Sequence, residues 1–455
     1  MASTPTKTIS LSLTATYAPS WGVWQGVREL VQNMHDGAYK SAEAIAPAYV
    51  WLSLQAGGLP SAPLSVLTLP TNDSGDRPIV VFQKGDGQTW TAFGNGGAVV
   101  GSVSYTPGRL EIRNASTSIS RKALLLGFSS KSSATEVIGA FGEGLKVGAL
   151  ALLRCGCELE MHTGDSLWVF ECLMSEDFGE KVLTVSVYPR PPPTALDDDV
   201  GAAVPREASD MVTIVRGLSP ADWDSARSRF LFLDSLTPDE IVGTPLGGLL
   251  LAPRHSGLLF VKGIFVADLK DTGLHTGVNL LQADLDRDRH SVTRQSDLEH
   301  AVATMWTKAL EVRPELLPRF MALLEDGAGT DVRLAAFYSD AALSGAIAAQ
   351  FHATHGALAV PMPWNTTRER IRELEAELSR PVVLCADALF GVLSKGGHTP
   401  DVGSLLDTHR RERVVHVPRS TLSPDATRQL EHAVQLLKIH DPGFDEHRIH
   451  VVEHA

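Results

Sequence analysis

Residues 21–38, WGVWQGVRELVQNMHDGA, constrain the fold more than any other stretch of the chain. At about 100° per residue, a helix would place Glu29, Asn33 and Asp36 within about 60° of one another. The apolar side chains fall on the opposite side, and these are Trp24, Val27, Leu30, Val31, Met34 and Ala38. We therefore predict a helix with one face for a core and one face that presents two carboxylates and an amide.

Two interpretations of this polar face are open. A solvated surface is the ordinary one, and the pattern alone favours it. The second is chemical, because Mg²⁺ takes hard oxygen ligands and the amide of Asn33 can supply one. Glu29, one turn earlier, could then polarise a water molecule aimed at a γ-phosphate.

A second motif, IGAFGEGLKVGAL at residues 138–150, is rich in glycine. Glycines let backbone N–H groups approach a phosphate, and a helix that begins after them adds its N-terminal dipole. Lys146 could meet a phosphate as a point charge. The segment lacks the GxxxxGK[ST] pattern of a P-loop, and it lacks the strand and acidic residue that frame a Rossmann turn.

Between these motifs lies RLEIRNASTSISRKALLLGFSSKSS, residues 109–133. LEI is typical of a strand end, and Asn114 is expected in the loop that follows. SRKALLLG predicts a short helix, and SSKSS predicts a polar turn that could form part of a lid over a nucleotide.

In this order, the three motifs resemble those of the GHKL (Bergerat-fold) ATPases, which include gyrase, heat-shock chaperones, histidine kinases and mismatch-repair proteins. ELVQNMHDGA resembles their N-box, LLLGFSSK resembles the segment after their adenine-binding motif, and IGAFGEGLK resembles their second glycine box. The resemblance covers about residues 20–155 and implies an α/β sandwich that binds ATP and Mg²⁺.

The resemblance also implies roles for individual residues. Glu29 corresponds to the catalytic general base, Asn33 to the Mg²⁺ ligand, and Asp36 to a support near the nucleotide. The other nucleotide-binding residues that it implies come from the lid and the phosphate loop: Lys131, Gly139, Phe141, Gly142, Glu143, Gly144 and Lys146.

The sequence departs from the family at the adenine-binding motif. The family usually has Asp-x-Gly there, whereas the corresponding residue here is Asn114, in Asn-Ala-Ser. The amide oxygen of Asn114 can accept the same hydrogen bond from adenine, but without charge assistance. This departure leaves open a catalytically weak nucleotide-binding scaffold that mediates protein interactions.

A proline-rich and acidic segment at residues 188–205, YPRPPPTALDDDVGAAVP, predicts an exposed connector. We therefore predict three domains within a mixed α/β (α+β) chain. These are an ATP-binding domain at residues 1–190, a middle, transducer-like α+β domain at 206–300 and a small C-terminal α/β domain at 301–455.

The predicted middle domain carries SGLLFVKGIFVADL at residues 256–269, whose β-branched and aromatic residues predict a strand. It resembles a strand in the middle domain of the large heat-shock chaperones. In those chaperones an arginine in a later loop reaches the γ-phosphate, so Lys262, Arg287 and Arg289 are candidate sensors here, with Arg287 assigned to catalysis. The alternative is a surface ion-pair cluster in the segment DRDR.

The last part of the chain alternates helix and strand patterns. GALAVPM and PVVLCA predict short buried strands, and TRERIRELEAEL and DALFGVLSK predict helices. Thr366 and Glu369 would form a capping box. Such alternation favours some parallel strand pairing.

The 455 residues carry a formal net charge of −13, which disfavours a broad nucleic-acid surface. No apolar run of about 18 residues predicts a membrane span, and the N-terminus lacks an apolar signal core. We expect an intracellular (cytoplasmic or nuclear) protein that hydrolyses ATP with Mg²⁺ and acts as a conformational switch or chaperone-like clamp. A protein client and a homodimer are expected only by analogy. A histidine kinase is disfavoured because no histidine precedes the N-box.

Overall fold

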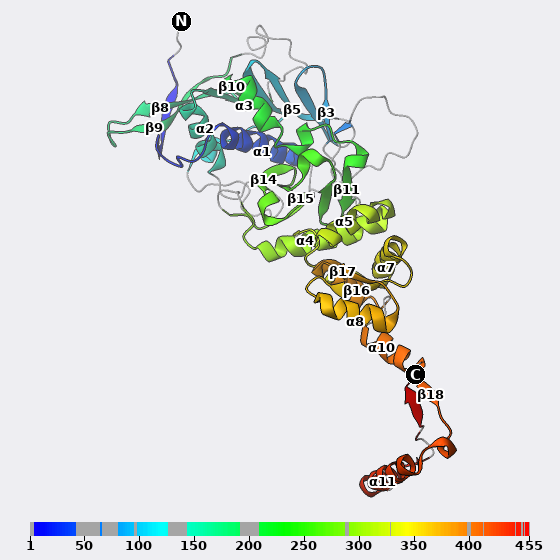
Figure 1. The fold of residues 1–455 in the computed structure, drawn as a ribbon. Helices are drawn as coiled ribbons and strands as arrows, with labels where there is room; N and C mark the ends of the chain where they lie inside the picture. Colours follow the sequence, from blue (N-terminus) through cyan, green and yellow to red (C-terminus); the bar gives the residue numbers. More distant parts are fainter. Residues whose placement is uncertain are drawn as a thin grey trace. The chain divides into compact units, whose positions relative to one another are not determined.

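The computed structural model describes residues 4–41, 64–65, 81–94, 98–125, 143–191, 209–286, 291–327, 329–397, 402–412, 414–441, 443–446, 449 and 451–454 (Figure 1). The chain divides into two compact units, one of residues 1–316 with 329–331 and one of residues 317–328 with 332–455. Both helices and strands contribute, so the predicted mixed α+β class is confirmed.

The first unit is built on a large sheet of ten described strands, in the order β1-β9-β8-β7-β10-β6-β5-β4-β3-β2. The described pairings in this sheet are all antiparallel. In chain order its strands are β1 (Lys7–Thr14), β2 (Leu64–Ser65), β3 (Val81–Lys84), β4 (Thr89–Phe93), β5 (Val99–Thr106), β6 (Gly108–Asn114), β7 (Glu158–Thr163), β8 (Ser166–Met174), β9 (Lys181–Pro189) and β10 (Met211–Leu218).

Strand β10 follows the predicted connector, yet it lies near the middle of the sheet between β6 and β7. Met211 pairs with Asn114 of β6, and Val212 pairs with His162 of β7. The sheet of the first domain therefore continues past the predicted boundary at residue 190, because a strand from beyond the connector completes it.

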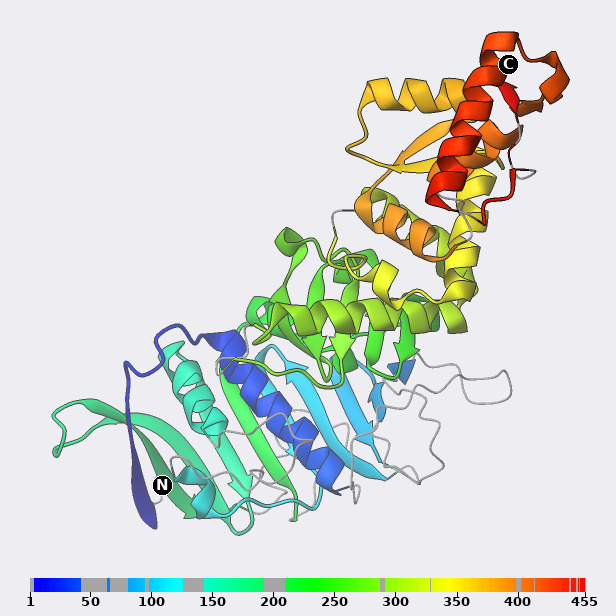
Figure 2. The same ribbon diagram turned by 90° about the horizontal axis from the view of Figure 1, so that it is seen from below.

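Three helices pack against one face of this sheet: α1 (Val23–Ser41), α2 (Gly144–Arg154) and α3 (Pro220–Arg227). Figure 2 shows α1, in dark blue, and α2, in teal, crossing the same face of the sheet. Helix α1 contacts β5 and β6, whereas α2 contacts β7 and β8. The core between helices and sheet includes a stacked pair, Trp223 and Tyr105, whose ring centroids lie 5.3 Å apart.

Side chains alternate between the two faces along each strand, and the apolar ones lie on the face that the helices cover. In β6, Leu110 and Ile112 are buried in the core, while Arg109, Glu111 and Arg113 alternate with them. Arg109 Nη2 lies 3.2 Å from Glu111 Oε2, whereas Arg113 pairs with the distant Asp210.

Helix α1 confirms the helix predicted at residues 21–38, and Val27, Leu30, Val31 and Met34 are buried. The expectation of a solvated polar face is wrong, because Arg28, Glu29, Gln32, His35 and Asp36 are buried as well. Helix α2 packs against α1 at Gly26 and Glu29, whereas His35 packs against Phe82 and Phe232. The two helices can approach closely at Gly26 and Gly148, where a Cβ on Gly26 would lie 2.9 Å from the carbonyl oxygen of Gly148.

A second sheet of five described strands has the order β11-β12-β15-β13-β14. Its strands are β11 (Ile241–Thr244), β12 (Gly247–Leu250), β13 (Leu258–Val261), β14 (Ile264–Asp268) and β15 (Gly277–Leu280). Strands β13 and β15 pair in parallel. Helix α4 (Gln295–Val312) contacts β11 and β12, so it belongs to the first unit although it extends past the predicted boundary at residue 300.

The segment predicted as one strand at residues 256–269 forms two strands, β13 and β14, joined by a tight turn. Lys262 and Gly263 occupy this turn with φ angles of +52° and +78°. Positive φ at both central residues is the geometry of the favoured two-residue hairpin turn.

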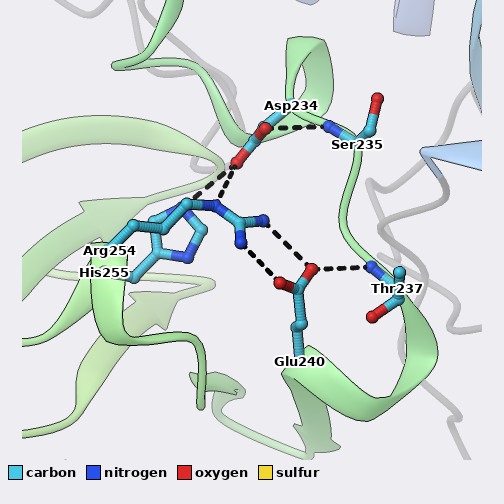
Figure 3. Close-up of polar contacts among 6 residues, drawn as sticks. All are labelled: Asp234, Ser235, Thr237, Glu240, Arg254 and His255. Carbon is cyan, nitrogen blue, oxygen red and sulfur yellow. Dashed lines mark hydrogen bonds and ion pairs between the residues drawn. The ribbon is translucent and has the colours of Figure 1, made fainter.

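The loops beside the second sheet are tied together by the ion-pair cluster in Figure 3. Arg254 binds the carboxylate of Glu240 through two nitrogens and also donates from Nε to Asp234 Oδ2 at 3.3 Å. His255 Nε2 lies 3.2 Å from the same Asp234 oxygen. The hydrogen bonds from Arg254 and from the backbone N–H of Thr237 lower the pKa of Glu240 to about 2.

Short 3-10 helices occur throughout the described chain, and these are η2 (Arg121–Leu124), η4 (Leu231–Leu233), η5 (Pro238–Glu240), η6 (Pro253–His255), η7 (Lys270–Thr272), η8 (Pro314–Leu316) and η9 (Arg419–Thr421). The helix predicted from SRKALLLG corresponds to η2.

The second unit contains α5 (Leu317–Asp326), α6 (Ala335–Tyr338), α7 (Ala341–His355), β16 (Val360–Pro363), α8 (Arg368–Leu378), β17 (Val382–Cys385), α9 (Asp387–Lys395), α10 (Val402–Glu412), β18 (Val414–His416), α11 (Pro424–His440) and β19 (Val452–His454). Strands β16 and β17 pair in parallel with α8 between them in sequence, which confirms the predicted parallel pairing. The N-cap of α8 is Thr367 rather than Thr366, because its hydroxyl accepts the backbone N–H of Arg370 at 3.3 Å.

None of the described helices is long and apolar enough to cross a membrane.

Candidate functional site

Helices α1 and α2 bring the first two motifs of the sequence together. A Cβ built on Gly144, the first residue of α2, would lie 2.0 Å from Glu29 Oε2 and 3.0 Å from Glu29 Cδ. Gly148, one turn later, would place a Cβ 3.1 Å from Glu29 Cβ. The carboxylate of Glu29 therefore lies against the N-terminus of α2, in space that only glycine leaves open.

The charge of Glu29 is compensated locally. Its Oε1 accepts hydrogen bonds from Arg28 Nε at 3.2 Å and from Arg28 Nη2 at 3.0 Å. Both side chains are buried, and Arg28 also lies over the ring of Trp21 at 5.2 Å. A buried carboxylate needs such partners, and the positive end of the α2 dipole adds to them. The arrangement holds a carboxylate in a fixed position beside a helix N-terminus.

The other two polar residues of the predicted N-box differ in their surroundings. Asn33 is half-buried, one turn after Glu29 on α1. Asp36 is buried, and its Oδ1 lies 3.9 Å from His35 Nδ1. Among the described residues, no group of three or more His, Cys, Asp or Glu side chains could hold a metal ion. Mg²⁺ bound by Asn33 and phosphate oxygens would need no such group, so this role stays a prediction.

Asn114 is the last residue of β6 rather than part of the following loop, and it is completely buried. Its Nδ2 donates to the carbonyl oxygen of Met34 in α1 at 2.8 Å. That bond fixes the orientation of the amide, since a carbonyl oxygen can only accept. Asn114 Oδ1 is buried and has no hydrogen-bond partner among the described residues. An unsatisfied buried acceptor calls for an explanation.

The backbone after Asn114 has a conformation that is unusual for its residues. Ser116 has a φ of +48°, in the left-handed region that glycine adopts easily and serine does not. In the resemblance to the GHKL ATPases, Ser116 corresponds to the glycine of their adenine-binding motif. Its backbone N–H donates to Asp210 Oδ1 at 3.0 Å. The conformation suited to glycine is thus present although the glycine is absent.

Lys146 is buried within α2, and its Nζ donates to the carbonyl oxygens of Ala123 at 3.2 Å and Leu125 at 2.5 Å. Burial lowers the pKa of Lys146, and the nearby charge of Glu143, the N-cap of α2, opposes this effect only in part. The ammonium group links α2 to the end of η2. Its contact with a phosphate stays a prediction.

Several predicted site residues lie outside the described residues, and these are Lys131, Gly139, Phe141, Gly142, Arg287 and Arg289. The remaining sensor candidate, Lys262, occupies the turn between β13 and β14 and is buried. Its backbone N–H donates to the carbonyl oxygen of Leu280 at 2.8 Å.

Sequence reasoning missed two residues that shape the site. Asp210, just before β10, contacts Ser116 across a separation of 94 residues. Arg154, at the end of α2, donates to the carbonyl oxygens of four residues that lead into α1: Ala15, Tyr17, Ala18 and Trp21. No local pattern in the sequence signals either contact, because each depends on how distant segments pack.

No protein-family model matches the chain, and no curated protein shows significant similarity to it.

Proposed function

We propose that this protein binds ATP at a GHKL-type (Bergerat-type) site and hydrolyses it with the help of Mg²⁺, as a nucleotide-driven conformational switch. The observation that carries the proposal is the contact between Glu29 and Gly144. It places the residue proposed to activate water at the start of the helix proposed to bind phosphate. Two motifs far apart in sequence thus meet at one point, as a phosphoryl-transfer site requires.

Each polar group has a defined task in this proposal. Glu29 accepts the proton of the attacking water, and Arg28 keeps its carboxylate in place through the bond at 3.0 Å. The backbone N–H groups of Gly144 and Leu145, at the start of α2, would donate to the phosphates. Mg²⁺, held by Asn33 and the phosphates, would neutralise negative charge on the phosphate oxygens.

The buried oxygen of Asn114 fits the base of the nucleotide. The amino group of adenine can donate to Oδ1, which otherwise lacks a partner among the described residues. Guanine presents a carbonyl oxygen at the corresponding edge, and two acceptors cannot bond to each other. The protein should therefore bind ATP more tightly than GTP. The expected difference in binding free energy is about 1–3 kcal/mol, which is the cost of leaving a buried acceptor without a hydrogen bond.

Glu29→Gln tests the catalytic part of the proposal. The amide keeps the size of the side chain but cannot accept a proton, so ATP turnover should fall by about a hundredfold or more while ATP binding persists. Glu111→Gln is the matched control, since Glu111 lies on β6 and pairs with Arg109. Unchanged turnover in Glu29→Gln would exclude the role of Glu29.

A nucleotide-binding scaffold without turnover is the second candidate. Two observations favour it: the family carboxylate is replaced by the neutral Asn114, and Glu29 is engaged by Arg28. Isothermal titration with Mg-ATP, combined with a phosphate-release assay, separates the candidates. Binding with no release of phosphate would support the scaffold, in which the bound state serves to recruit a protein partner.

A further inference from the structure

Asp210 binds residues on both sides of Asn114 in the sequence. Its Oδ1 accepts the backbone N–H of Ser116 at 3.0 Å, and its Oδ2 accepts Arg113 Nε at 2.7 Å. Asp210 is completely buried, and Arg113 is nearly so. The carboxylate thus binds the residue before Asn114 and the second residue after it.

The backbone at Ser116 needs such an anchor. A residue with a Cβ is strained in the left-handed region, and such strain persists only where the surroundings impose it. Ala115 contributes one constraint, because its N–H donates to the carbonyl oxygen of Val100 at 3.0 Å. Asp210 supplies the constraint at the strained residue itself.

Only a carboxylate suits this position. Both neighbours are donors, and an ionised aspartate offers an acceptor oxygen to each of them. An asparagine would direct its NH₂ group toward one of the two donors. Arg113 also neutralises the buried charge, so the carboxylate is present with a partner.

We propose that Asp210 is a positioning residue that replaces the missing glycine of the base-binding motif. By holding Ser116 in the left-handed conformation, it keeps the Asn114-Ala115-Ser116 turn in place and fixes the position of Asn114 Oδ1, the acceptor proposed for the ligand. This inference rests on the proposed function, because the ligand is the adenine base of ATP.

A double-mutant cycle between Asp210→Asn and Ser116→Gly tests the proposal, with the Kd for Mg-ATP as the readout. Asp210→Asn should weaken binding by about tenfold, which is the scale of one strained backbone residue. Ser116→Gly should bind as the wild type does. The double variant should recover to within about threefold of the wild type, because glycine adopts the left-handed conformation without an anchor. A double variant as weak as Asp210→Asn would overturn the proposal.

Asp331→Asn is the matched control. Asp331 is also completely buried, and it accepts two backbone N–H groups, from His275 at 2.6 Å and from Thr276 at 3.1 Å. Its variant should lose stability, and Ser116→Gly should not restore it. If Asp210→Asn does not yield folded protein, Ser116→Gly is compared with the double variant. Equal affinity supports the proposal, whereas binding about tenfold weaker in the double variant contradicts it.

Failure of this inference can be distinguished from failure of the proposed function. If the wild type does not bind Mg-ATP, the proposed function is wrong, and the same four proteins are unfolded in urea without nucleotide. If Asp210 holds Ser116 in the left-handed conformation, Ser116→Gly should still restore part of the stability lost in Asp210→Asn. If the losses in free energy of unfolding of Asp210→Asn and Ser116→Gly simply add in the double variant, Asp210 does not hold Ser116 in its conformation.

Discussion

Asn114 uses its two polar atoms for different purposes. Its NH₂ group binds the carbonyl oxygen of Met34 in α1, so the strand end and the helix are joined through one side chain. Its oxygen has no partner among the described residues. A carboxylate at this position would place an oxygen against the carbonyl of Met34, so an amide rather than a carboxylate suits the packing of α1 on β6.

Gly144→Ala provides a test of the site that leaves Glu29 chemically intact. The new Cβ would lie 2.0 Å from Glu29 Oε2, so the carboxylate must move. We expect ATP turnover to fall by about tenfold or more with a smaller change in nucleotide affinity, because misplacement affects the reacting geometry first. Gly22→Ala is the control, since its nearest neighbour outside the adjacent residues would be Gln25 Oε1 at 3.9 Å. Equal turnover in both variants would show that ATP hydrolysis does not depend on the position of the Glu29 carboxylate beside Gly144.

At the residue scale, the sequence identified candidate site residues but did not predict their burial or their contacts. The spacing of Glu29, Asn33 and Asp36 on one helix was recoverable from periodicity. The burial of Glu29 was not, since it depends on the packing of Gly144 and Gly148 of α2 against its side chain. Asp210 could not be found, because its contact with Arg113 spans 97 residues and no local pattern marks it.

At the scale of elements, α2 positions α1 from both ends. The first residue of α2 lies against Glu29, and Arg154 at its other end binds the segment before α1 through four carbonyl oxygens. The guanidinium of Arg154 presents a planar fork of donors that a lysine cannot reproduce. Helix α2 is therefore a brace for the helix that carries the proposed catalytic residue.

Arg154→Lys should lower the free energy of unfolding by about 1–3 kcal/mol, because several carbonyl oxygens lose their donor. Urea unfolding followed by circular dichroism measures the change. Arg428→Lys on α11 is the control, because Arg428 is exposed and pairs mainly with Asp425 one turn away. Equal stability of the two variants would show that the four bonds of Arg154 contribute little.

The loops around Arg254 should make stability depend on pH in acid. The pKa of Glu240 is lowered from 4.5 to about 2 by Arg254 and Thr237 (Figure 3), so its ionised form is favoured in the folded state. The stabilisation is present above pH 4.5 and is lost as the pH falls toward 2. Glu240→Gln should be less stable than the wild type at pH 6, and the difference should shrink by pH 2.5. A constant difference across this range would contradict the assignment.

Elements that depend on local sequence patterns were predicted, whereas those that depend on contacts between distant segments were missed. The parallel pair β16 and β17 with α8 between them was predicted from local alternation of patterns. The turn inside residues 256–269 was not recognised, because Lys262 is an uncommon residue for a positive φ. The insertion of β10 between β6 and β7 was missed, since pairing partners far apart in sequence leave no periodic signal.

At the scale of the whole molecule, the proposed nucleotide site lies within the first compact unit. The described residues of the site lie on α1, in the stretch from Arg113 to Ser116, at the start of α2 and at Asp210 just before β10. Nucleotide binding should therefore stabilise this unit, by about 2.7 kcal/mol at a ligand concentration a hundred times Kd. The second unit contributes none of the described site residues.

Thermal melting of the purified protein with and without millimolar Mg-ATP, alongside the Asn33→Ala variant, tests the proposed nucleotide site most directly. We expect a higher melting temperature for the wild type with Mg-ATP, a smaller rise with Mg-GTP, and no rise for Asn33→Ala. An unchanged melting temperature of the wild type at millimolar Mg-ATP would contradict the nucleotide site on which the whole proposal depends.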